Sequence, residues 1–532
     1  MLVASPLRSQ LLPVGDIPTH VFRSAESRPE DVVLVDAETE QTFTIGDIIT
    51  TSTRLAAGLS QAGHSGQVIS VFDNTSLRCV YVYYAALLIG GTYQSLGTDI
   101  GASQLHDRIQ RSSTSAVFTT RKYVGQLKEA TRGMGLAVYV LDHGYCKCRT
   151  LCAAPESLAQ CPSFVHRLLD DPMFAPVRIT DSCDAMRQPA YLTYVAGSPV
   201  PLTLSHYGML STHQLGGPVK SAQSHRRTVV SAIPFANAHG IGNIAHYPML
   251  SGSRVVQLSK VDPQSCVAAI EKWQPSTLLV TYDVLTSILA GATRKGNRLA
   301  VGEREYDTGS LKVIFTHELR GCAAESIRGR ASQLFHARLV ELYGFMKTGL
   351  VAGVITEYPR IAGSVGILCS NVTARVTEAD RDVEDGCFGE ILVSTPRMDT
   401  GSGGVTNYFN TGDYGTVTQS GAVIVKARVA DLIRLSHGVV APGDIESRVL
   451  EHPAVVDCAA VADTSQTDDG CIVRPCVFIV TGNGCSYTAE SLVIALQVDY
   501  PGIYARFTDH ISRCFRGEPD RAALRATLAG QA

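Results

Sequence analysis

The chain carries no excess of charge of either sign. Across its 532 residues, 46 lysines and arginines nearly balance 49 aspartates and glutamates. A protein that binds nucleic acid or an anionic membrane through its overall field carries a clear excess of basic residues. The balance excludes that route, so we expect neither nucleic acid nor a membrane among the partners.

Long apolar runs are missing as well. The longest run, from Val80 to Gly90, is far shorter than the roughly 20 residues that cross a bilayer as a helix. The first fifteen residues include Arg8 but have neither the apolar core nor the small-residue cleavage pattern of a signal peptide. We therefore expect a cytoplasmic protein.

Cysteine is sparse for this length, with 15 residues that show no spacing of a secreted disulfide scaffold. Four cysteines do crowd one segment, namely Cys146, Cys148, Cys152 and Cys161. They could ligate zinc, but the paired C-x2-C knuckles typical of structural zinc sites are absent. We interpret them as reduced surface thiols and predict no metal-ligating residue, with zinc as the alternative.

What the chain does contain is an ordinary globular composition, 45% hydrophobic and 18% charged, at a length that suits two or more domains. Short apolar strands alternate with helices of about ten residues or more, a pattern of βαβ units and a mostly parallel sheet. The predicted strands are 32–35, 68–72, 116–119, 138–141, 191–193, 228–232 and 277–280, and the predicted helices are 45–62, 77–89 and 103–111.

A domain boundary is predicted near Asp431. The segment KARVADLIRL passes there from a strand-like pattern into a polar joint. Pro442, Asp444 and Glu446 then give a helix-start signal, with acidic side chains in the first turn. We predict a large α/β domain over 1–430, with several subdomains and mostly parallel sheets, and a small mobile α+β domain over 431–532.

The segment Tyr191 to His206, YLTYVAGSPVPLTLSH, has the frame of a phosphate-binding loop without its chemistry. Such a loop needs glycines for close backbone approach, hydroxyls that donate to the anion, and a cation. Tyr194 adds bulk instead, and Val200 carries no charge. Losing one preorganised donor costs about 3 to 4 kcal/mol of transition-state stabilisation, so polyphosphate chemistry is predicted to be impaired.

Four later segments complete a resemblance. They are Tyr343-Gly344, Thr411-Gly412-Asp413, Arg428 with Asp431, and APGDIE at 441–446. With the loop and the terminal RGEPDRAAL at 516–524, they resemble the adenylate-forming superfamily of the 4-coumarate-CoA-ligase type, from about residue 17 to 528. The resemblance implies a large acyl- and nucleotide-binding domain with a mobile lid. It also implies that Tyr343, Gly344, Asp413 and Arg428 contact a nucleotide, the aspartate through the ribose hydroxyls.

Three positions depart from the family's pattern in charge. Val200 replaces the lysine of the loop, Lys347 replaces the glutamate that the resemblance assigns to Mg²⁺, and Glu518 replaces the catalytic lysine. A carboxylate 4 Å from a phosphate charge repels it by roughly 4 kcal/mol at an effective dielectric of 20. The family would imply ATP, Mg²⁺ and CoA as cofactors, and the first two are doubtful here, so the cofactor stays unknown.

The substrate side of the resemblance includes four polar residues. Asn237 stands at the family's usual histidine in PFANAHGIG, His239 follows two residues on, and His317 and Glu318 occupy the adenine wall. We predict that Asn237 and His239 contact an acyl ligand. Because a histidine can exchange a proton near neutral pH, His239, His317 and Glu318 are the candidate catalytic residues, unless these side chains merely fill the space that a nucleotide would take.

Three functions remain open at this point. The first is an acyl-CoA-ligase-like protein of small-molecule, secondary metabolism that handles a carboxylic acid or acyl thioester, with ATP-dependent activation weakened or absent. The second is a genuine ATP-dependent acyl-CoA ligase with unusual motifs. The third is a non-catalytic binding or scaffold protein. A synthase or a carrier protein is the partner that the first function would suggest.

Overall fold

The computed structural model describes residues 2–13, 15–74, 76–141, 167–194, 200–215, 227–235, 238–296, 298–317, 323–354, 361–398, 407–436, 438–452, 455–467, 470–481, 496–512 and 519–529. The four clustered cysteines, Cys146 to Cys161, lie outside these ranges. Within them, no group of three or more His, Cys, Asp or Glu residues is placed to hold a metal ion. No helix among them has the length and apolar content needed to cross a membrane.

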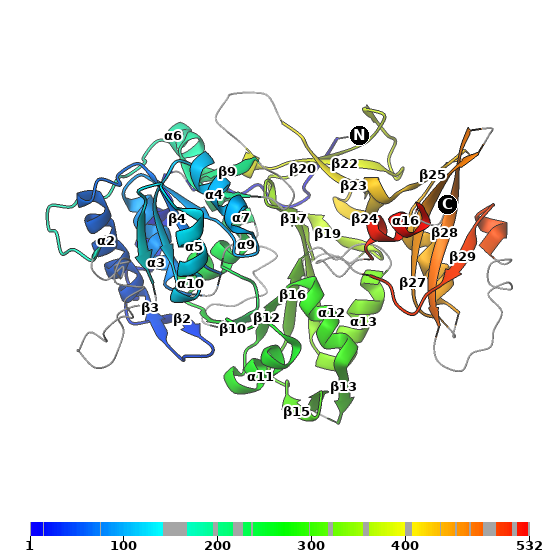
Figure 1. Ribbon diagram of the computed structural model, residues 1–532, viewed down its shortest axis with the longest axis horizontal. Helices are drawn as coiled ribbons and strands as arrows, with labels where there is room; N and C mark the ends of the chain where they lie inside the picture. Colours follow the sequence, from blue (N-terminus) through cyan, green and yellow to red (C-terminus); the bar gives the residue numbers. More distant parts are fainter. Residues whose placement is uncertain are drawn as a thin grey trace.

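A six-stranded sheet organises the N-terminal part of the chain (Figure 1). Its neighbouring strands pair in parallel, except that β8 and β9 form an antiparallel hairpin. In sheet order the strands are β7 (Ala137–Val140), β6 (Thr114–Thr119), β4 (Val68–Phe72), β5 (Thr92–Ser95), β8 (Pro189–Tyr194) and β9 (Pro201–Ser205). The helices of this part are α1 (Ile17–Ala25), α2 (Ile45–Gln61), α3 (Cys79–Leu88), α4 (Ala102–Arg111), α5 (Val124–Ala130), α6 (Ser182–Arg187) and α7 (His206–Leu215).

The position of helix α3 in the core explains why its sequence is apolar on every face. Every one of its ten residues is buried, which is expected of a helix packed on all sides rather than one with a solvent face. Three of its neighbours in the core, α2, β4 and β5, contact it directly. The apolar run from Val80 to Gly90 is therefore a core helix.

A second, larger sheet runs through the middle of the molecule. Its parallel section has the order β17 (Arg338–Phe345), β16 (Val313–His317), β12 (Thr277–Val280), β10 (Thr228–Ser231), β11 (Arg254–Gln257) and β2 (Val32–Asp36). Antiparallel strands extend both ends: β3 (Thr42–Thr44) beyond β2, and on the other side β18 (Gly349–Gly353), β19 (Ser364–Leu368), β24 (Ala422–Arg428), β23 (Phe409–Val417), β22 (Gly389–Ser394), β20 (Thr373–Glu378) and β1 (Leu2–Ala4).

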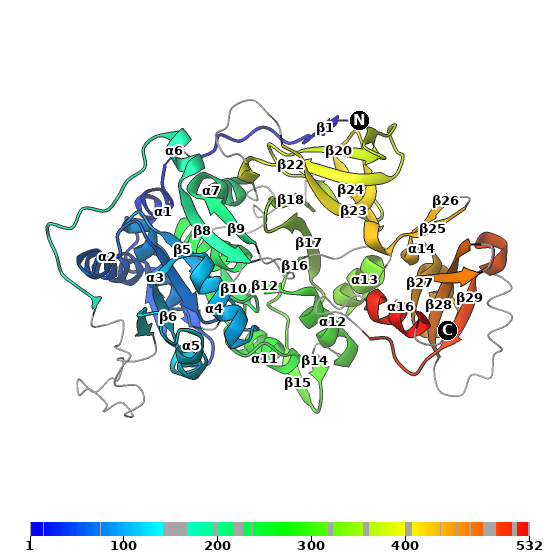
Figure 2. The ribbon, with the colours of Figure 1, turned by 45° about the horizontal axis from the view of Figure 1, so that its top comes forward.

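The parallel section carries the helices α9 (Ala238–Ile241), α10 (Tyr247–Ser251), α11 (Pro263–Trp273), α12 (Tyr282–Gly291) and α13 (Ala323–Phe335). A separate antiparallel sheet follows α12. It consists of three short strands, β13 (Ala292–Lys295), β14 (Arg298–Val301) and β15 (Arg304–Asp307). Figure 2 shows this small sheet far from the yellow strands of the same large sheet.

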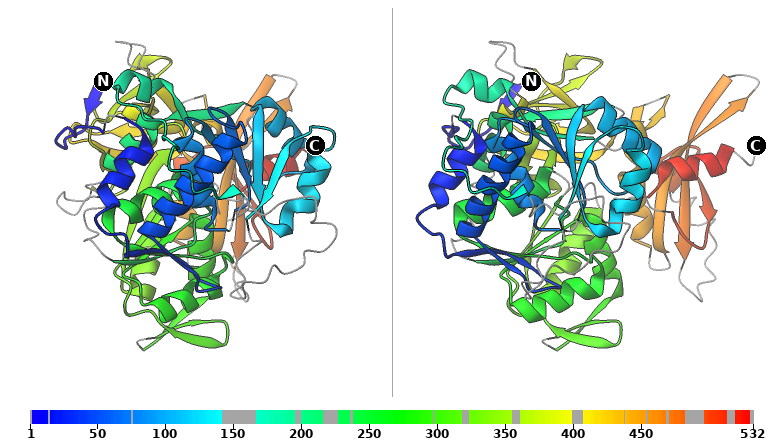
Figure 3. Two further views of the ribbon diagram at one scale, coloured as in Figure 1. Left: turned by 90° about the vertical axis from the view of Figure 1, so that its left-hand side faces the viewer. Right: turned by 60° about the vertical axis from the view of Figure 1, so that its left-hand side comes forward.

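The last hundred residues form two small sheets of their own, β25–β26 and β27–β28–β29, drawn in orange and red on the right of Figure 1. The elements are β25 (Ile433–Leu435), β26 (Gly438–Val440), α14 (Pro442–Leu450), β27 (Val455–Thr467), β28 (Gly470–Thr481), β29 (Tyr504–Phe507) and α16 (Arg521–Ala529). In the right-hand view of Figure 3, the orange strands of this part project to the right, away from the blue elements of the N-terminal part. The division at residue 431 stays a prediction, and η6 (Val429–Asp431) is the short turn that lies there.

Each strand and helix that the sequence predicts is present, with ends within two residues of those expected. The helix-start signal at Pro442 is confirmed as well, because α14 begins at that residue. These segments were predictable because their apolar residues recur with the period of the element that they form.

Candidate functional site

Tyr343, Asp413 and Arg428 meet where β17, β23 and β24 come together. The Tyr343 hydroxyl donates to Oδ2 of Asp413 over 2.8 Å, and Nη1 of Arg428 lies 3.2 Å from Oδ1 of the same carboxylate. Asp413 and Arg428 are also register partners on the antiparallel strands β23 and β24, which places their side chains on one face. Asp413 is fully buried, whereas the Arg428 side chain is 26% exposed. The arginine therefore reaches solvent and the carboxylate does not.

The Thr411-Gly412-Asp413 segment holds its own shape. The Thr411 hydroxyl donates to the Ile391 carbonyl over 2.7 Å and accepts from the Asp413 amide over 3.1 Å. Gly412 has a φ of +69°, a left-handed conformation that a residue with a Cβ adopts at a cost. Arg428 adds a third link by donating to the Thr411 carbonyl over 3.0 Å. The segment is thus fixed before any ligand is present.

Gly344 is required by strand packing. A Cβ at this position would lie 2.2 Å from the carbonyl oxygen of Gly349 on β18. The register between β17 and β18 shifts between Tyr343 and Gly344, so the two backbones approach closely there. This contact accounts for the glycine without a nucleotide, and a cofactor contact at Gly344 stays a prediction.

Lys347 lies beside this group on the turn that joins β17 to β18. Its side chain is exposed, and its ammonium sits 5.6 Å from the centroid of the Phe409 ring, within cation–π range. Phe409 in turn packs on Phe345, with ring centroids 5.5 Å apart. The position that the resemblance assigns to a magnesium ligand therefore holds a cation supported by two aromatic rings.

The phosphate-loop region is only partly described, because residues 195–199 lie outside the described ranges. On its N-terminal side, the Tyr194 ring lies under the Arg108 guanidinium at 4.5 Å, and its hydroxyl donates to the Arg108 carbonyl over 3.4 Å. Partial burial raises the pKa of Tyr194. On the other side, Val200 is 66% exposed. The tyrosine in the place of a glycine therefore packs against α4.

His206 has a structural role. The amide of Ile17, the first residue of α1, donates to its Nδ1 over 3.2 Å, so the ring serves one of the free N–H groups at that helix end. His206 is 1% exposed, and burial lowers its pKa to about 4. A ring held neutral and bonded in this way ties the β9–α7 corner to the N-terminus of α1.

The four predicted acyl-site residues are placed only in part. Asn237 and Glu318 lie outside the described residues. The backbone places His239 within α9 and His317 at the end of β16, while their side chains are not among those described. Whether these residues meet in one pocket therefore stays a prediction.

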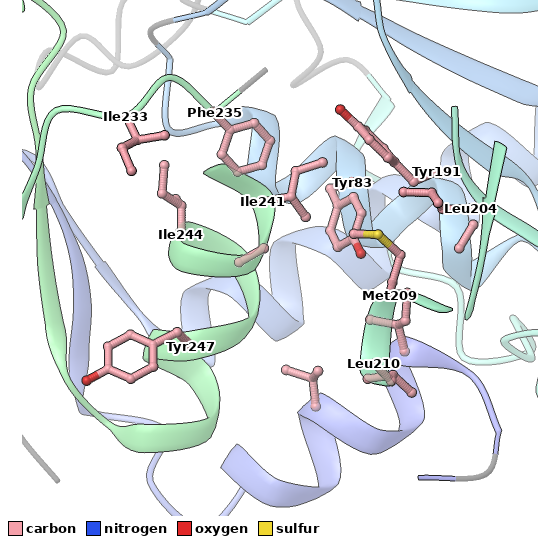
Figure 4. Close-up of a cluster of buried hydrophobic side chains, with 14 of the residues drawn as sticks. Tyr83, Tyr191, Leu204, Met209, Leu210, Ile233, Phe235, Ile241, Ile244 and Tyr247 are labelled. Carbon is pink, nitrogen blue, oxygen red and sulfur yellow. The ribbon is translucent and has the colours of Figure 1, made fainter. Parts of the chain in front are cut away.

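The helix that follows His239 is unusual. Between α9 and α10 the chain forms a π-helical turn, η4 (Gly242–His246), a rare conformation that is frequent at functional sites. His246 at its end bonds the Tyr83 hydroxyl through Nε2 over 2.8 Å inside the core. Figure 4 shows Tyr83 and Phe235 directed into the same buried cluster as Ile241 and Ile244.

Two buried polar residues near this cluster were missed at the sequence level, His246 and Arg397. Arg397 is 5% exposed and donates to the sulfur of Met209 over 3.6 Å; burial lowers its pKa to about 10, opposed by the nearby Tyr191 and Tyr83. Its only sequence signal is a lone arginine after the apolar strand GEILVS. Neither contact could be anticipated, because the partners lie more than 150 residues away in the chain.

The residues predicted to contact a nucleotide differ in the chemistry that they offer. The buried carboxylate of Asp413, with Arg428 beside it, has the chemistry to accept bonds from sugar hydroxyls. An ammonium at Lys347 cannot ligate a divalent cation, which takes oxygen ligands, and Val200 cannot neutralise a phosphate. Asp413 is 0% exposed and bonded within the protein, so a ribose contact at this position and the loss of a magnesium-bound polyphosphate site both stay predictions.

Comparison with known proteins agrees with this architecture. A profile of the AMP-binding enzyme family matches residues 21–401. A 4-coumarate–CoA ligase of Humulus lupulus is 23% identical, over 97% of this chain and 96% of its own length. An acyl-CoA ligase of Alternaria alternata is 22% identical, over 93% and 90%. A solved benzoate CoA ligase of Burkholderia xenovorans superposes with a TM-score of 0.74 at 17% identity, covering 96% of this chain and 99% of that one.

The fold is therefore that of the adenylate-forming enzymes. The profile match spans well over half of the chain, and the chain belongs to the AMP-binding enzyme family.

Proposed function

We propose that this protein is an acyl-CoA-ligase-like protein that handles a carboxylic acid or an acyl thioester, and that ATP-dependent activation is absent or strongly weakened. The observation that carries the proposal is the charge at the predicted nucleotide site. By the resemblance, Lys347 replaces the magnesium ligand and Val200 replaces the loop's lysine, and both side chains are exposed. The predicted ribose contacts, Asp413 and Arg428, are both present and pair with each other.

The physical argument concerns the polyphosphate. Leaving-group stabilisation in adenylation needs fixed positive charge and amide donors around the phosphates. Lys347 supplies one positive charge, but its ammonium would not supply the Lewis-acid chemistry that Mg²⁺ would bring to the phosphates. Glu518 lies outside the described residues; by the resemblance it replaces the family's lysine and would add a negative charge to the site. Together, these changes of charge should weaken the binding of ATP far more than the binding of a ligand that has no polyphosphate.

The acid or thioester part of the proposal is supported by the relatives. Their names include a 4-coumarate–CoA ligase, a benzoate CoA ligase and an acyl-CoA ligase. In this chain Phe235, directly before the predicted substrate residues, packs edge-on against Tyr93 with ring centroids 6.4 Å apart. Phe235 and Tyr93 are both buried, and the apolar, aromatic character of this segment supports the proposal that the neighbouring part of the chain takes an apolar acyl group.

Two alternatives each have an observation in their favour. A genuine ATP-dependent ligase is favoured by the relatives, which are named as ligases. A non-catalytic binder or scaffold is favoured by Asp413, whose bonds to Tyr343 and Arg428 hold the strands together without a ligand. For the acyl-CoA-ligase-like protein and for the non-catalytic binder, we propose a synthase or a carrier protein as the partner.

Acid-dependent ATP–pyrophosphate exchange tests the central claim. We expect the wild-type chain to show no exchange above background with a panel of aryl and alkyl carboxylic acids. The triple variant Val200→Lys, Lys347→Glu, Glu518→Lys restores the family's charges and should gain exchange with at least one acid. A matched control, Lys347→Met, removes the ammonium without restoring a metal ligand and should gain nothing. Clear exchange by the wild type would establish the genuine ligase instead.

Thioester turnover without ATP separates a repurposed pocket from a scaffold. Release of free CoA from benzoyl-CoA or 4-coumaroyl-CoA is followed with a thiol reagent. If the pocket is catalytic, we expect His239→Ala, His317→Ala or Glu318→Gln to lower turnover by about 10² or more. Calorimetric titration with CoA and AMP gives the complementary result. Binding without turnover would favour the scaffold, and unchanged rates in all three variants would remove the acid–base role.

A further inference from the structure

A hollow outside the predicted active site lies at the lower end of the molecule. It has a volume of about 510 Å³, and its lining residues are Arg294, Arg298, Asp307, Gly309, Leu311, Lys312, Phe335 and His336. They come from the three-stranded sheet β13–β15, from the segment before β16, and from the end of α13. Pockets of this size accommodate small organic ligands.

The hollow lies at the opposite end of the parallel strands from the predicted nucleotide site. Lys312 directly precedes β16, whereas His317 ends it, so a strand of five residues, roughly 16 Å, separates the two edges. In Figure 1 the strands β13 and β15 lie at the bottom, well below β23 and β24. The inference is therefore independent of the proposed function.

Two basic side chains of the hollow differ from their basic neighbours. The neighbours each pair with a carboxylate. The Lys295 ammonium lies 3.4 Å from the Glu305 carboxylate. The Glu271 carboxylate pairs with Arg298 at 2.6 Å and with Arg304 at 3.3 Å. Among the residues that the structure describes, Arg294 and Lys312 instead donate only to backbone carbonyls. Both therefore keep a net positive charge that faces the hollow.

These two cations are also held in place. Arg294 donates to the Leu334 carbonyl over 2.6 Å and to the Gly296 carbonyl over 3.1 Å, which uses two of its five N–H donors. Lys312 donates to the Gly309 carbonyl over 3.1 Å and has two further donors. Because both side chains are already held in place, little side-chain entropy is lost when they bind an anion.

The rest of the lining indicates what kind of anion fits. Phe335 and Leu311 are each 1% exposed and form an apolar floor. His336 adds a ring that can bond, and Asp307 is the one carboxylate of the lining. A phosphate monoester carries about −1.5 to −2 charges at neutral pH and three acceptor oxygens, which match two cations better than a single carboxylate does. We propose that this hollow binds an organic phosphate, with the phosphate between Arg294 and Lys312 and the organic group over Phe335.

Photolabelling of the full chain with 8-azido-AMP, followed by peptide mapping, tests the proposal. We expect saturable labelling of peptides that contain residues 292–312 or 335–336, with AMP as an effective competitor. Arg294→Gln and Lys312→Gln should each lower the affinity about tenfold, the effect of losing one charged hydrogen-bond partner. Lys295→Gln is the matched control, because Lys295 neighbours Arg294 but pairs with Glu305 outside the lining, and it should leave labelling unchanged.

Several results would overturn the inference. One such result is labelling that maps only near Tyr343 and Asp413 and that the substitution Asp413→Asn abolishes. It would assign AMP to the family's nucleotide site alone. Competition by inorganic phosphate as strong as that by AMP would show that the apolar floor contributes nothing. Thermal melts of both glutamine variants establish that they fold, and because Lys312 is exposed, undiminished labelling of Lys312→Gln by itself contradicts the proposal.

Discussion

The hydroxyl of Tyr343 donates a hydrogen bond of 2.8 Å to the buried carboxylate of Asp413, 70 residues further along the chain. The bond joins β17, the last strand of the parallel section, to β23 in the antiparallel section. Both residues were predicted to contact a nucleotide. The structure gives each of them a partner within the protein, so their contribution to stability can be measured separately from any ligand.

Tyr343→Phe should lower the free energy of unfolding by about 1.5 to 3 kcal/mol, because it removes a hydrogen bond to a buried charged group. Urea denaturation measures the change. Tyr408→Phe is a suitable control, since the Tyr408 hydroxyl is 3.4 Å from the Thr373 hydroxyl at a partly exposed position, and its loss should cost under about 1 kcal/mol. Equal effects of the two variants would show that the Asp413 bond adds no special stability.

Gly344→Ala should destabilise the protein by about 3 kcal/mol or more, because the new methyl group would overlap the Gly349 carbonyl oxygen. Gly329→Ala is the matched control. A Cβ at Gly329, inside α13, meets no atom within 4 Å, and alanine is the better helix former by about 1 kcal/mol. Thermal melts should therefore move in opposite directions. A neutral Gly344→Ala would mean that this glycine is needed only for a ligand.

The sequence predicted the elements well because their signals are local. The strand at Thr277 and the helix at Pro442 are set by apolar spacing and by a helix-start residue within a few positions. The resemblance also assigned Tyr343 and Asp413 to one site, and the two side chains share a hydrogen bond. Each of these inferences rests on neighbours in sequence or on a resemblance along the whole chain.

The internal partners of the site could not be predicted in the same way. Nothing within ten residues of His206 indicates that it serves the amide of Ile17, 189 positions away, and nothing near Arg397 indicates burial beside Met209. Polar contacts between distant segments depend on how helices pack, and single-sequence patterns do not encode that packing. The acyl residues Asn237 and Glu318 remain predictions.

The stability of the fold should depend on pH through His206. Its pKa is lowered to about 4 in the folded protein, against an ordinary value of 6.5 in the unfolded chain. The ring is neutral in both states above pH 6.5, so its contribution is fully present there. Below 6.5 only the unfolded chain takes up the proton, and about 3 kcal/mol is lost as the pH falls toward 4.

His206→Asn isolates that contribution, because the asparagine oxygen can accept from the Ile17 amide but does not titrate. Unfolding free energies of the two proteins, measured in urea from pH 7 to pH 4, should converge or cross as the pH falls. The difference between them removes the titration of carboxylates that both share. Parallel curves would show that His206 does not bind its proton preferentially in the unfolded chain.

Arg328 and Glu341 form a buried ion pair between α13 and β17, with Nε of the arginine 2.9 Å from Oε2 of the glutamate and the side chains 9% and 2% exposed. Arg328→Met should cost about 3 to 5 kcal/mol, because a buried carboxylate then loses its counter-charge. The double variant Arg328→Met, Glu341→Met replaces both charges by apolar groups of similar volume and should recover most of that loss. Chemical denaturation of the single and double variants measures both steps. A double variant that is less stable than Arg328→Met would show that the pair stabilises the protein beyond compensating for its own burial, and that Glu341 supports the strand leading to Tyr343.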